Sequence, residues 1–321
     1  MLDLVTIGDL LIDFTHVGWS EQGGMLFERN PGGAPMNMAA QLQKLGGTAG
    51  VITTVGRDEH GEYLHGLMKD MGIDVTNIQF SDTVGTRFWF VYLEEDGDRV
   101  FSNYQGTRSD YETRAELLDV RMLENCKVFA YSTLCLEEGK PVKEAGEKAL
   151  AVAKAHGAMI AVDPNLRFPY ADPVRKQRVA DCIWDSQILK LTEEEFDYFL
   201  DGAGVEEGAA ALLAKNAKII AVTKGAEGSI LYTKHAKAEA PSYQVETQDT
   251  TGAGDSFMGS LVYQLTRDGV EIDALTEEDL YEIAKFCNAC AGLSTTKRGS
   301  LLVMPTMEEV QALMRTGVFR K

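Results

Sequence analysis

Short apolar runs alternate with helical stretches along most of the 321-residue chain, and this alternation constrains the fold more than any other feature. The apolar runs are typical of buried strands, and the stretches between them are typical of helices. Strands separated by helices of this length form βαβ units, whose strands are parallel. The sequence therefore predicts an α/β domain, doubly wound, with a mostly parallel sheet and helices on both faces. Expected strands are residues 4–8, 50–55, 127–131, 159–162, 188–191 and 219–223, and expected helices are residues 35–45, 58–71, 142–156, 174–184 and 208–215.

Two segments, residues 13–30 and 86–104, break this rhythm. In the second, Phe88 and Phe90 alternate with Trp89 and Val91, which predicts a strand with large apolar groups on both faces. Residues 94–98 then form a turn signal before another β run. One face of this strand is expected to cover a ligand or a second subunit. A sheet edge packed on the main core is the alternative.

The charge balance excludes several classes of partner. The chain has 31 Lys and Arg against 49 Asp and Glu, a formal net charge of −18. Nucleic-acid binding needs a basic face, and anionic membrane surfaces would repel so acidic a protein. No apolar stretch approaches the 18 or so residues that a membrane span needs. The N-terminus, with Asp3 and no basic leader, is expected to be a strand and not a signal peptide.

Five cysteines in a chain of this length do not form a disulfide framework, which predicts a cytoplasmic location. Cys287 and Cys290 form a CxxC, but they lie in a helical run and no second pair completes a zinc site. We therefore expect a structural role for both. The five histidines are scattered, and nothing in the sequence supports a hydrolase triad.

Residues 249–257 (Asp-Thr-Thr-Gly-Ala-Gly-Asp-Ser-Phe) lead directly into a helical pattern. The small residues Gly252, Ala253 and Gly254 let backbone N–H groups converge on an anion, where the helix dipole adds positive potential. Asp255 falls in the first turn, where a carboxylate can accept a proton from a hydroxyl that attacks phosphorus. Taken alone, the motif also fits a helix N-terminus with Asp255 as a plain capping acid.

A second run, residues 31–39 (Pro-Gly-Gly-Ala-Pro-Met-Asn-Met-Ala), also precedes a helix. Gly32 and Gly33 allow a backbone to approach a ligand closely, and Asn37 offers both a donor and acceptors. A tight turn into a helix is the alternative reading. The chain has no GxxxxGK[ST], and Phe257 stands where a GxGxxG would need glycine, so P-loop and dinucleotide-binding functions lose their main support.

Both runs resemble the signatures of one family. The order Gly32-Gly33-x-Pro35-x-Asn37-x-Ala39, with Gly46 and Gly56 after it, is similar to the N-terminal signature of the ribokinase-like (PfkB) sugar kinases. Residues 249–255 are similar to the C-terminal signature, with a small departure at Gly259-Ser260. The likeness runs in order from Ile7 to Pro305, and residues 8–14, 163–167 and 295–299 most resemble fructokinases.

The resemblance implies a ribokinase-like fold with a small β-sheet lid over the sugar. Residues 1–13, 32–79 and 107–321 would form the α/β domain that binds nucleotide and substrate, and residues 14–31 and 80–106 the lid. Lids of this family pair in some members, so a homodimer through the lid is expected. The two apolar faces of residues 86–93 fit that expectation.

The resemblance also implies roles for single residues. Asp255 would be the base that activates a primary hydroxyl of the sugar, while backbone N–H groups of Gly252, Ala253 and Gly254 stabilise charge on the γ-phosphoryl group of ATP. Arg167 would lie near the phosphates. The implied sugar contacts are Asp9, Asp13, Gly32, Gly33, Asn37, Tyr104, Gln105 and Asn165, and the implied nucleotide contacts are Lys190, Thr223, Gly225, Gly228 and Asn288.

Two cations are implied in the same way. Mg²⁺ is expected with ATP, held mostly by phosphate oxygens and water. The family's Asn-x-x-Glu segment corresponds to residues 192–195, where Glu195 keeps the acid but Thr192 replaces the Asn; an acidic helix N-terminus is an equally good reading. A monovalent cation such as K⁺ binds in many members, and Asp249, Thr251 and Gly299 match those positions.

Substrate choice depends on one substitution. Related 2-keto-3-deoxygluconate kinases bind a sugar acid, and its carboxylate favours an arginine. Where those enzymes and many fructokinases have Tyr-Arg after the lid strands, this chain has Tyr104-Gln105, which favours a neutral sugar. Arg87 and Arg108 are near in sequence and offer a substitute for the missing arginine.

The sequence therefore predicts an ATP-dependent sugar kinase that acts on a primary hydroxyl, with D-fructose as the expected substrate and fructose 6-phosphate as the product. A 2-keto-3-deoxygluconate kinase or another PfkB sugar kinase is the alternative within the same chemistry. A catalytically inactive sugar-binding regulatory homologue is the alternative from a different class. The intact Asp255 and its glycine-rich loop argue against the inactive homologue.

Overall fold

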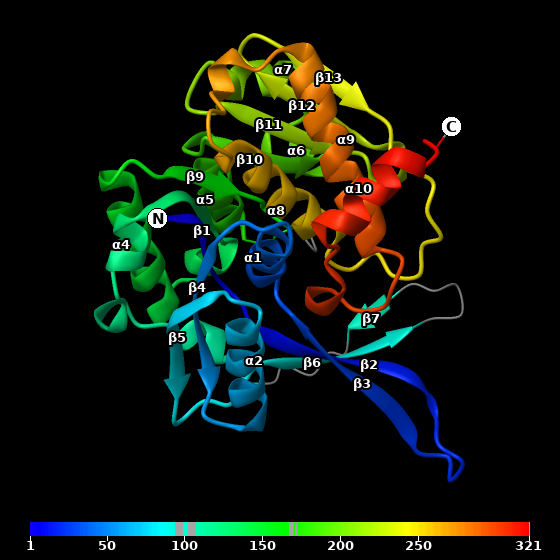
Figure 1. Ribbon diagram of the computed structural model, residues 1–321. Coiled ribbons are helices and arrows are strands. Elements are labelled where there is room, and N and C mark those ends of the chain that lie inside the picture. Colours follow the sequence, from blue (N-terminus) through cyan, green and yellow to red (C-terminus); the bar gives the residue numbers. More distant parts are fainter. Residues whose placement is uncertain (94–98, 102–106, 167–169, 171, 321) are drawn as a thin grey trace.

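A nine-stranded sheet forms the centre of the molecule, as the alternation in the sequence predicts (Figure 1). The computed structural model describes residues 1–93, 99–101, 107–166, 170 and 172–320. The strand order is β13-β12-β11-β10-β9-β8-β1-β4-β5, parallel from β11 to β5, with β12 antiparallel to both of its neighbours. The bounds are β1 (Leu2–Ile7), β4 (Ala49–Gly56), β5 (Asp74–Ser81), β8 (Cys126–Tyr131), β9 (Met159–Val162), β10 (Ile188–Thr192), β11 (Ile219–Thr223), β12 (Ser229–Thr233) and β13 (Lys237–Ala240).

Helices cover both faces of this sheet, because successive strand residues point to opposite sides. On β1, Leu4 belongs to one buried cluster and Val5 to the other. The first face is covered by α1 (Ala34–Lys44), α2 (Glu59–Asp70), α8 (Ala253–Thr266) and α9 (Glu277–Ser294). The second is covered by α3 (Arg121–Glu124), α4 (Pro141–Ala155), α5 (Pro173–Trp184), α6 (Glu193–Phe199) and α7 (Val205–Leu213), while α10 (Met307–Thr316) packs on α9.

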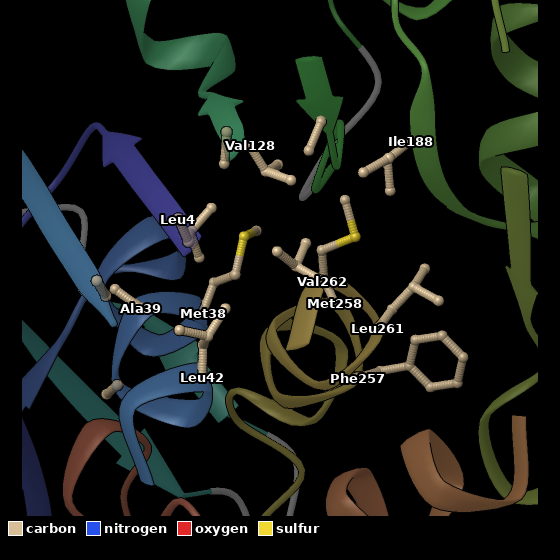
Figure 2. Close-up of a cluster of buried hydrophobic side chains, with 14 of the residues drawn as sticks. Leu4, Met38, Ala39, Leu42, Val128, Ile188, Phe257, Met258, Leu261 and Val262 are labelled. Carbon is tan, nitrogen blue, oxygen red and sulfur yellow. The ribbon is translucent and has the colours of Figure 1, made fainter. Parts of the chain in front are cut away.

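Helices α1 and α8 lie side by side on the first face (Figure 2). Met38 and Leu42 of α1 are buried together with Met258 and Val262 of α8, beneath Leu4 of β1. Gly259 lets the two helices approach closely, because a Cβ placed there would lie 2.4 Å from the carbonyl oxygen of Met38. This contact sets the distance between the two sequence motifs, since each motif begins one of these helices.

We expect Gly259→Ala to destabilise the fold by about 1–3 kcal/mol, the usual cost of overpacking a close-packed core. It should also lower turnover, because any separation of the helices moves the groups at their N-termini. Gly66→Ala in α2 is the matched control: a Cβ there meets nothing within 4 Å, so stability should stay equal or rise slightly. Urea unfolding of both variants measures the difference, and equal stability would contradict the close contact.

A separate four-stranded sheet, in the order β3-β2-β6-β7, projects from the α/β body (Figure 1). Strand β2 is antiparallel to β3 and parallel to β6. Aromatic rings gather on one of its faces: Phe14 stacks 5.6 Å from Phe90, and Phe27 meets Phe90 edge-on at 5.1 Å. The bounds are β2 (Leu11–Trp19), β3 (Met25–Gly32), β6 (Phe88–Leu93) and β7 (Arg99–Phe101), while β5 continues the main sheet to Ser81.

Asp58 fastens the start of β6 to the α/β body. Its carboxylate caps α2 by accepting the N–H groups of His60 and Gly61, and it also accepts both the N–H and the hydroxyl of Thr86 at 2.7 Å. Burial alone would raise the pKa of Asp58, but the donors from Thr86 and Gly61 outweigh it and lower the pKa. The residue before Arg87 is thereby held in place.

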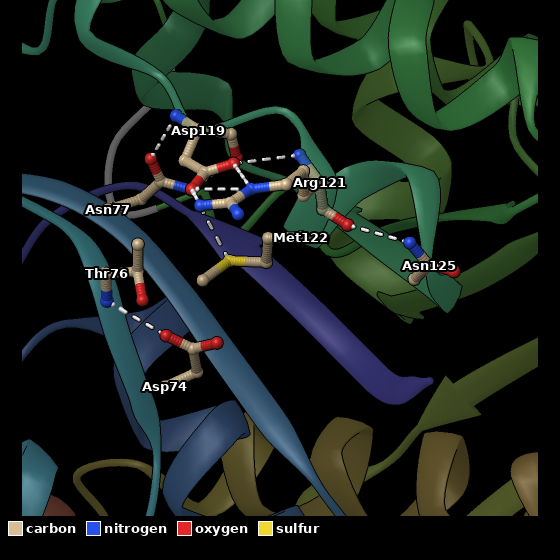
Figure 3. Close-up of polar contacts among 7 residues, drawn as sticks. All are labelled: Asp74, Thr76, Asn77, Asp119, Arg121, Met122 and Asn125. Atoms are coloured by element: carbon tan, nitrogen blue, oxygen red, sulfur yellow. Dashed lines mark hydrogen bonds and ion pairs between the residues drawn. The ribbon is translucent and has the colours of Figure 1, made fainter.

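Asn77 links β5 to the segment before α3 through two side-chain hydrogen bonds (Figure 3). Its side chain donates to the carbonyl of Asp119 at 3.0 Å and accepts the N–H of Asp119 at 2.8 Å. Asp119 in turn pairs with the exposed Arg121. This pair joins the segment before α3 to the first residue of α3.

The cysteines are all free, and Cys287 and Cys290 lie on α9 as buried thiols. Burial raises the pKa of Cys290 to about 12, so it stays protonated and packs as an apolar group. Within the described residues, no helix is both long and apolar enough to cross a bilayer.

Candidate active site

The candidate site lies at the carboxyl ends of the parallel strands, where ligands bind in open α/β sheets. Strand β1 pairs with β4 on one side and β8 on the other, which makes it the switch point of the sheet. Asp9 follows β1, Asp163 follows β9, and Lys190 belongs to β10. Residues far apart in sequence therefore meet at one edge.

Asp255 and Asn37 make the contact that joins the two sequence motifs. Asn37 Nδ2 donates to Asp255 Oδ2 at 2.8 Å, and both side chains are buried. Ser256, the residue after Asp255, donates to Oε1 of Gln41, one turn further along α1, at 2.8 Å. The packing of α1 on α8 thus fixes the direction of the Asp255 carboxylate.

The N-terminus of α8 is left open to an anion. Its N-cap is Gly252, in the left-handed region with φ +80°, so the N-cap residue itself supplies no side-chain cap. The Ala253 N–H donates to Thr250 O at 3.3 Å, and the Ser256 N–H is the one that reaches Gly252 O. N–H groups of the first turn, including that of Gly254, are therefore available to a ligand. Asp255 lies in this same first turn.

Lys190 brings a buried positive charge to this helix end. Its Nζ lies 2.7 Å from Asp163 Oδ2, and a Cβ on Gly254 would lie only 3.0 Å from the same Nζ. Burial lowers the pKa of Lys190, but the charges of Asp163, Glu195 and Asp255 outweigh it and raise the pKa above its ordinary value. The ammonium is therefore charged at neutral pH, next to the backbone that would receive a phosphate.

Glu195, whose charge also acts on Lys190, holds the start of α6 in place. It caps α6 in a capping box with Thr192, and its two oxygens accept the N–H groups of Leu166 at 2.7 Å and Thr192 at 2.9 Å. Burial and the charge of Asp163 raise the pKa of Glu195, against the opposing effect of Lys190. In the described part of the chain, no three acids, histidines or cysteines group into a metal site.

The glycines of the first motif bring two acids toward this edge. Gly33 has φ +125°, and a Cβ there would lie 2.0 Å from the carbonyl oxygen of Asp9. A Cβ on Gly32 would lie 3.1 Å from Asp13 Oδ2. Asn165 adopts φ +46° and donates its N–H to Asp163 Oδ1 at 3.1 Å. Of the residues expected at the sugar, Asp9 and Asn165 thus lie in the loops after β1 and β9, Gly33 follows β3, and Asp13 and Gly32 belong to the paired strands β2 and β3.

A second group of expected residues lies at the ends of β11 and β13. Gly225 has φ +56°, and a Cβ placed there would meet no described atom within 4 Å. A Cβ on Gly228 would lie 2.2 Å from Ala240 O, the same carbonyl that accepts the Asn288 amide at 2.9 Å. Thr223 is half-buried at the end of β11. Gly228 and Asn288 are thus brought together at the end of β13 by the carbonyl of Ala240.

Asp249, Thr251 and Gly299 are also brought together. Asp249 is buried and accepts the N–H of Thr251 at 2.8 Å and the N–H of Gly299 at 2.9 Å. The carboxylate therefore ties the loop before α8 to the segment after α9. Tyr104, Gln105 and Arg167 lie outside the described residues.

Sequence reasoning missed the contact of Asp163 with Lys190, and it also missed the buried carboxylate of Asp110. Asp163 directly follows strand β9, in a segment whose likeness to fructokinases was visible, and its position after a strand was the available signal. Asp110 is fully buried beside Arg87 and Arg108, and no pattern in the sequence predicts that contact.

Comparisons with known proteins agree with this geometry. The family described as "pfkB family carbohydrate kinase" matches residues 1–307. A protein named probable fructokinase-4 from Arabidopsis thaliana is 36% identical over 318 residues, covering 97% of this chain and 96% of that protein. The crystal structure of fructokinase with bound ATP from Xylella fastidiosa has a TM-score of 0.85 and 26% identity, covering 98% of this chain and 99% of that one. A fructokinase from Vibrio cholerae O395, solved with fructose, ADP and calcium ion, has a TM-score of 0.81 and 25% identity, covering 96% of this chain and 98% of that one.

Proposed function

The chain belongs to the pfkB family of carbohydrate kinases, and we propose that it transfers the γ-phosphoryl group of ATP to the 6-hydroxyl of D-fructose. The observation that carries this proposal is the buried Asp255, held by Asn37 beside the N-terminus of α8 and the ammonium of Lys190. Base, anion cradle and positive charge lie together, as phosphoryl transfer requires. The names of the relatives supply fructose as the sugar.

Asp255 accepts the proton of the acceptor hydroxyl as that oxygen attacks phosphorus. Asn37 donates to Asp255 Oδ2, and its own Oδ1 is buried without a hydrogen-bond partner among the described residues. That acceptor is available to a hydroxyl of the sugar, so one side chain would orient both base and substrate. Asp9, Asp13 and Asn165 are proposed to bind the remaining hydroxyls.

The N-terminus of α8 and Lys190 stabilise negative charge that develops on the transferring group. We propose that Arg167 assists them, and that Thr223, Gly225, Gly228 and Asn288 form the wall against the adenosine. Tyr104 and Gln105 are proposed to close the site over the sugar.

An Mg²⁺ ion bound to ATP would supply further positive charge at the phosphates, held mainly by phosphate oxygens and water. Glu195 remains the proposed protein group nearest to it, through an oxygen that keeps a lone pair beyond its bond to a backbone N–H. The Asp249, Thr251 and Gly299 cluster is the proposed site for K⁺, which would stiffen the loop before α8.

We also propose a homodimer that forms through the small sheet, in a reducing cytoplasm that matches the free cysteines. Exposed apolar side chains gather at the β2–β3 hairpin, where Trp19 is 61% exposed and Met25 and Leu26 are each 46% exposed. Leu26→Asp should shift the protein toward monomer in analytical ultracentrifugation. Leu117→Asp changes a leucine that is also exposed, at 58%, but lies outside this sheet, and it should leave the mass unchanged. A wild-type monomer at all concentrations would contradict the proposal.

A coupled ADP-release assay over fructose, ribose, 2-keto-3-deoxygluconate and nucleosides tests the activity. Fructose is expected to give the highest kcat/KM. A preference for the sugar acid would overturn the assignment of a neutral sugar, and no ADP with any acceptor would favour the inactive homologue.

A further inference from the structure

Two arginines share one fully buried carboxylate at the base of the small sheet. Arg87, directly before β6, donates from Nη1 to Asp110 Oδ2 at 2.5 Å, and Arg108 donates from Nε to Asp110 Oδ1 at 3.3 Å. The Arg87 side chain is only 13% exposed, and its Nε is buried without a hydrogen-bond partner among the described residues. A buried donor with no acceptor costs about 1–3 kcal/mol, which makes this group a candidate for ligand contact.

Arg87 also lies near Asp9, the acid that follows β1. The N–H of Ile12, at the start of β2, donates to the carbonyl oxygen of Arg87 at 3.0 Å, so the loop that carries Asp9 runs into the strand beside Arg87. The charge of Asp9 acts on the Arg87 guanidinium, yet no hydrogen bond or ion pair joins the two side chains in the described part of the chain. A carboxylate only accepts and a guanidinium only donates, whereas a hydroxyl does both and can bridge them.

The charges at this end of the site balance. Arg87 and Arg108 carry two positive charges, and Asp110 and Asp9 carry two negative ones. Among these four described side chains, a carboxylate on the substrate would meet no surplus positive charge, while a neutral polyol would find one donor and one acceptor. The arrangement therefore favours a neutral sugar.

Arg87 is also held rigidly enough to select a ligand. Asp58 fixes the backbone and hydroxyl of Thr86, Asp110 fixes Nη1, and the ring of Trp89 lies 5.2 Å from the guanidinium carbon. A donor held on three sides loses little freedom when it binds, which raises its selectivity.

We propose that Arg87 is a specificity-determining residue. Its guanidinium donates a hydrogen bond to a hydroxyl of the sugar, and the same hydroxyl donates to Asp9. Asp110 holds the guanidinium in place. This inference rests on the proposed sugar kinase activity. It places the residue that recognises this hydroxyl at the start of β6, and it explains a preference for a neutral sugar without residues 104 and 105.

Arg87→Gln is expected to raise KM for fructose on the order of 10–100-fold, the effect of one charge-assisted hydrogen bond, and to leave KM for ATP within about twofold. Arg87→Gln also leaves Asp110 with one partner fewer, so Arg87→Gln/Asp110→Asn is measured beside it. The double variant should recover stability but keep the raised KM. Arg121→Gln, which removes the exposed arginine at the start of α3 from its partner Asp119, is the control and should change neither quantity.

A merely structural Arg87 would give the opposite pattern, with KM for fructose returning to the wild-type value in the double variant, and that result overturns the inference. If the wild type prefers another neutral sugar, the effect of each variant is measured on the KM for that sugar. A wild type that prefers the anionic 2-keto-3-deoxygluconate overturns the inference, as does one that phosphorylates no sugar. A wild type that uses fructose with an unaffected Arg87→Gln overturns the inference alone and leaves the proposed activity standing.

Discussion

Asp255→Asn is expected to lower kcat about 10²–10⁴-fold, the usual contribution of a positioned general base. The amide has the shape of the carboxylate but cannot take the proton of the acceptor hydroxyl. Its oxygen can still accept the Asn37 Nδ2–H that Asp255 Oδ2 accepts at 2.8 Å, so α1 and α8 should stay together. Fructose affinity, measured by calorimetry in the absence of ATP, should change less than about threefold because the hydrogen-bonding shape is kept.

The matched control is Asp268→Asn, the same substitution at an exposed residue just beyond α8. It should leave kcat, fructose affinity and the midpoint of urea unfolding as they are in the wild type. Near-normal turnover by Asp255→Asn would remove Asp255 from the role of base. A loss of turnover that accompanied unfolding would point to a structural role instead.

Lys190→Met is expected to affect both stability and turnover. Asp163 and Glu195 would remain buried near Asp255 without their counter-charge, and breaking a buried pair in this way costs about 3–5 kcal/mol. Turnover should fall on the order of 10²–10³-fold, because the anion site beside Gly254 loses its side-chain cation. Urea unfolding and steady-state kinetics measure the two effects separately.

The double variant Lys190→Met/Asp163→Asn separates the two roles of Lys190. It should recover most of the stability, since fewer charges remain buried, but not the turnover. Recovery of both would mean that Lys190 only neutralises Asp163. Lys285→Met, which removes a lysine paired with the exposed Glu282 on α9, should change stability by less than about 1 kcal/mol.

The stabilisation by Lys190 also has an expected pH dependence. Its native pKa is raised, so this stabilisation is fully present below the unfolded value of about 10.4 and is lost as the pH rises through the native pKa. The stability difference between the wild type and Lys190→Met should therefore be steady between about pH 7 and about pH 9 and shrink only in stronger alkali.

The parallel strands β1, β4, β8, β9, β10 and β11 could be predicted because they are short apolar runs buried on both faces, whereas β5, β12 and β13 were not expected. Leu4-Val5 and Ile219-Ile220 place one apolar residue in each core cluster, so the pattern needs no knowledge of the rest of the chain. Strands β2 and β3 gave no such signal. Val17, Trp19, Met25 and Leu26 are exposed in the single chain, so apolar and polar residues do not alternate with burial there.

The site was predictable where a local motif carries the chemistry, and not where contacts are long-range. Gly252 and Asp255 form a motif within one helix start, so their roles could be proposed before the fold was known. The pair of Lys190 with Asp163 and the pair of Arg87 with Asp110 join separate elements, and their geometry depends on strand order. From the sequence alone, Glu195 fits both a metal-site acid and an acidic helix N-terminus. The capping box that it forms with Thr192 is seen only in the structure.

The central claim is tested most directly by the product of a single reaction with ATP and D-fructose, analysed by phosphorus and proton NMR. The account predicts one sugar phosphate, with phosphorus coupled to the protons of C6, formed in equal amount with ADP. Phosphate on another carbon, or ADP formed with inorganic phosphate and no sugar phosphate, would contradict the placement of the 6-hydroxyl between Asp255 and the N-terminus of α8.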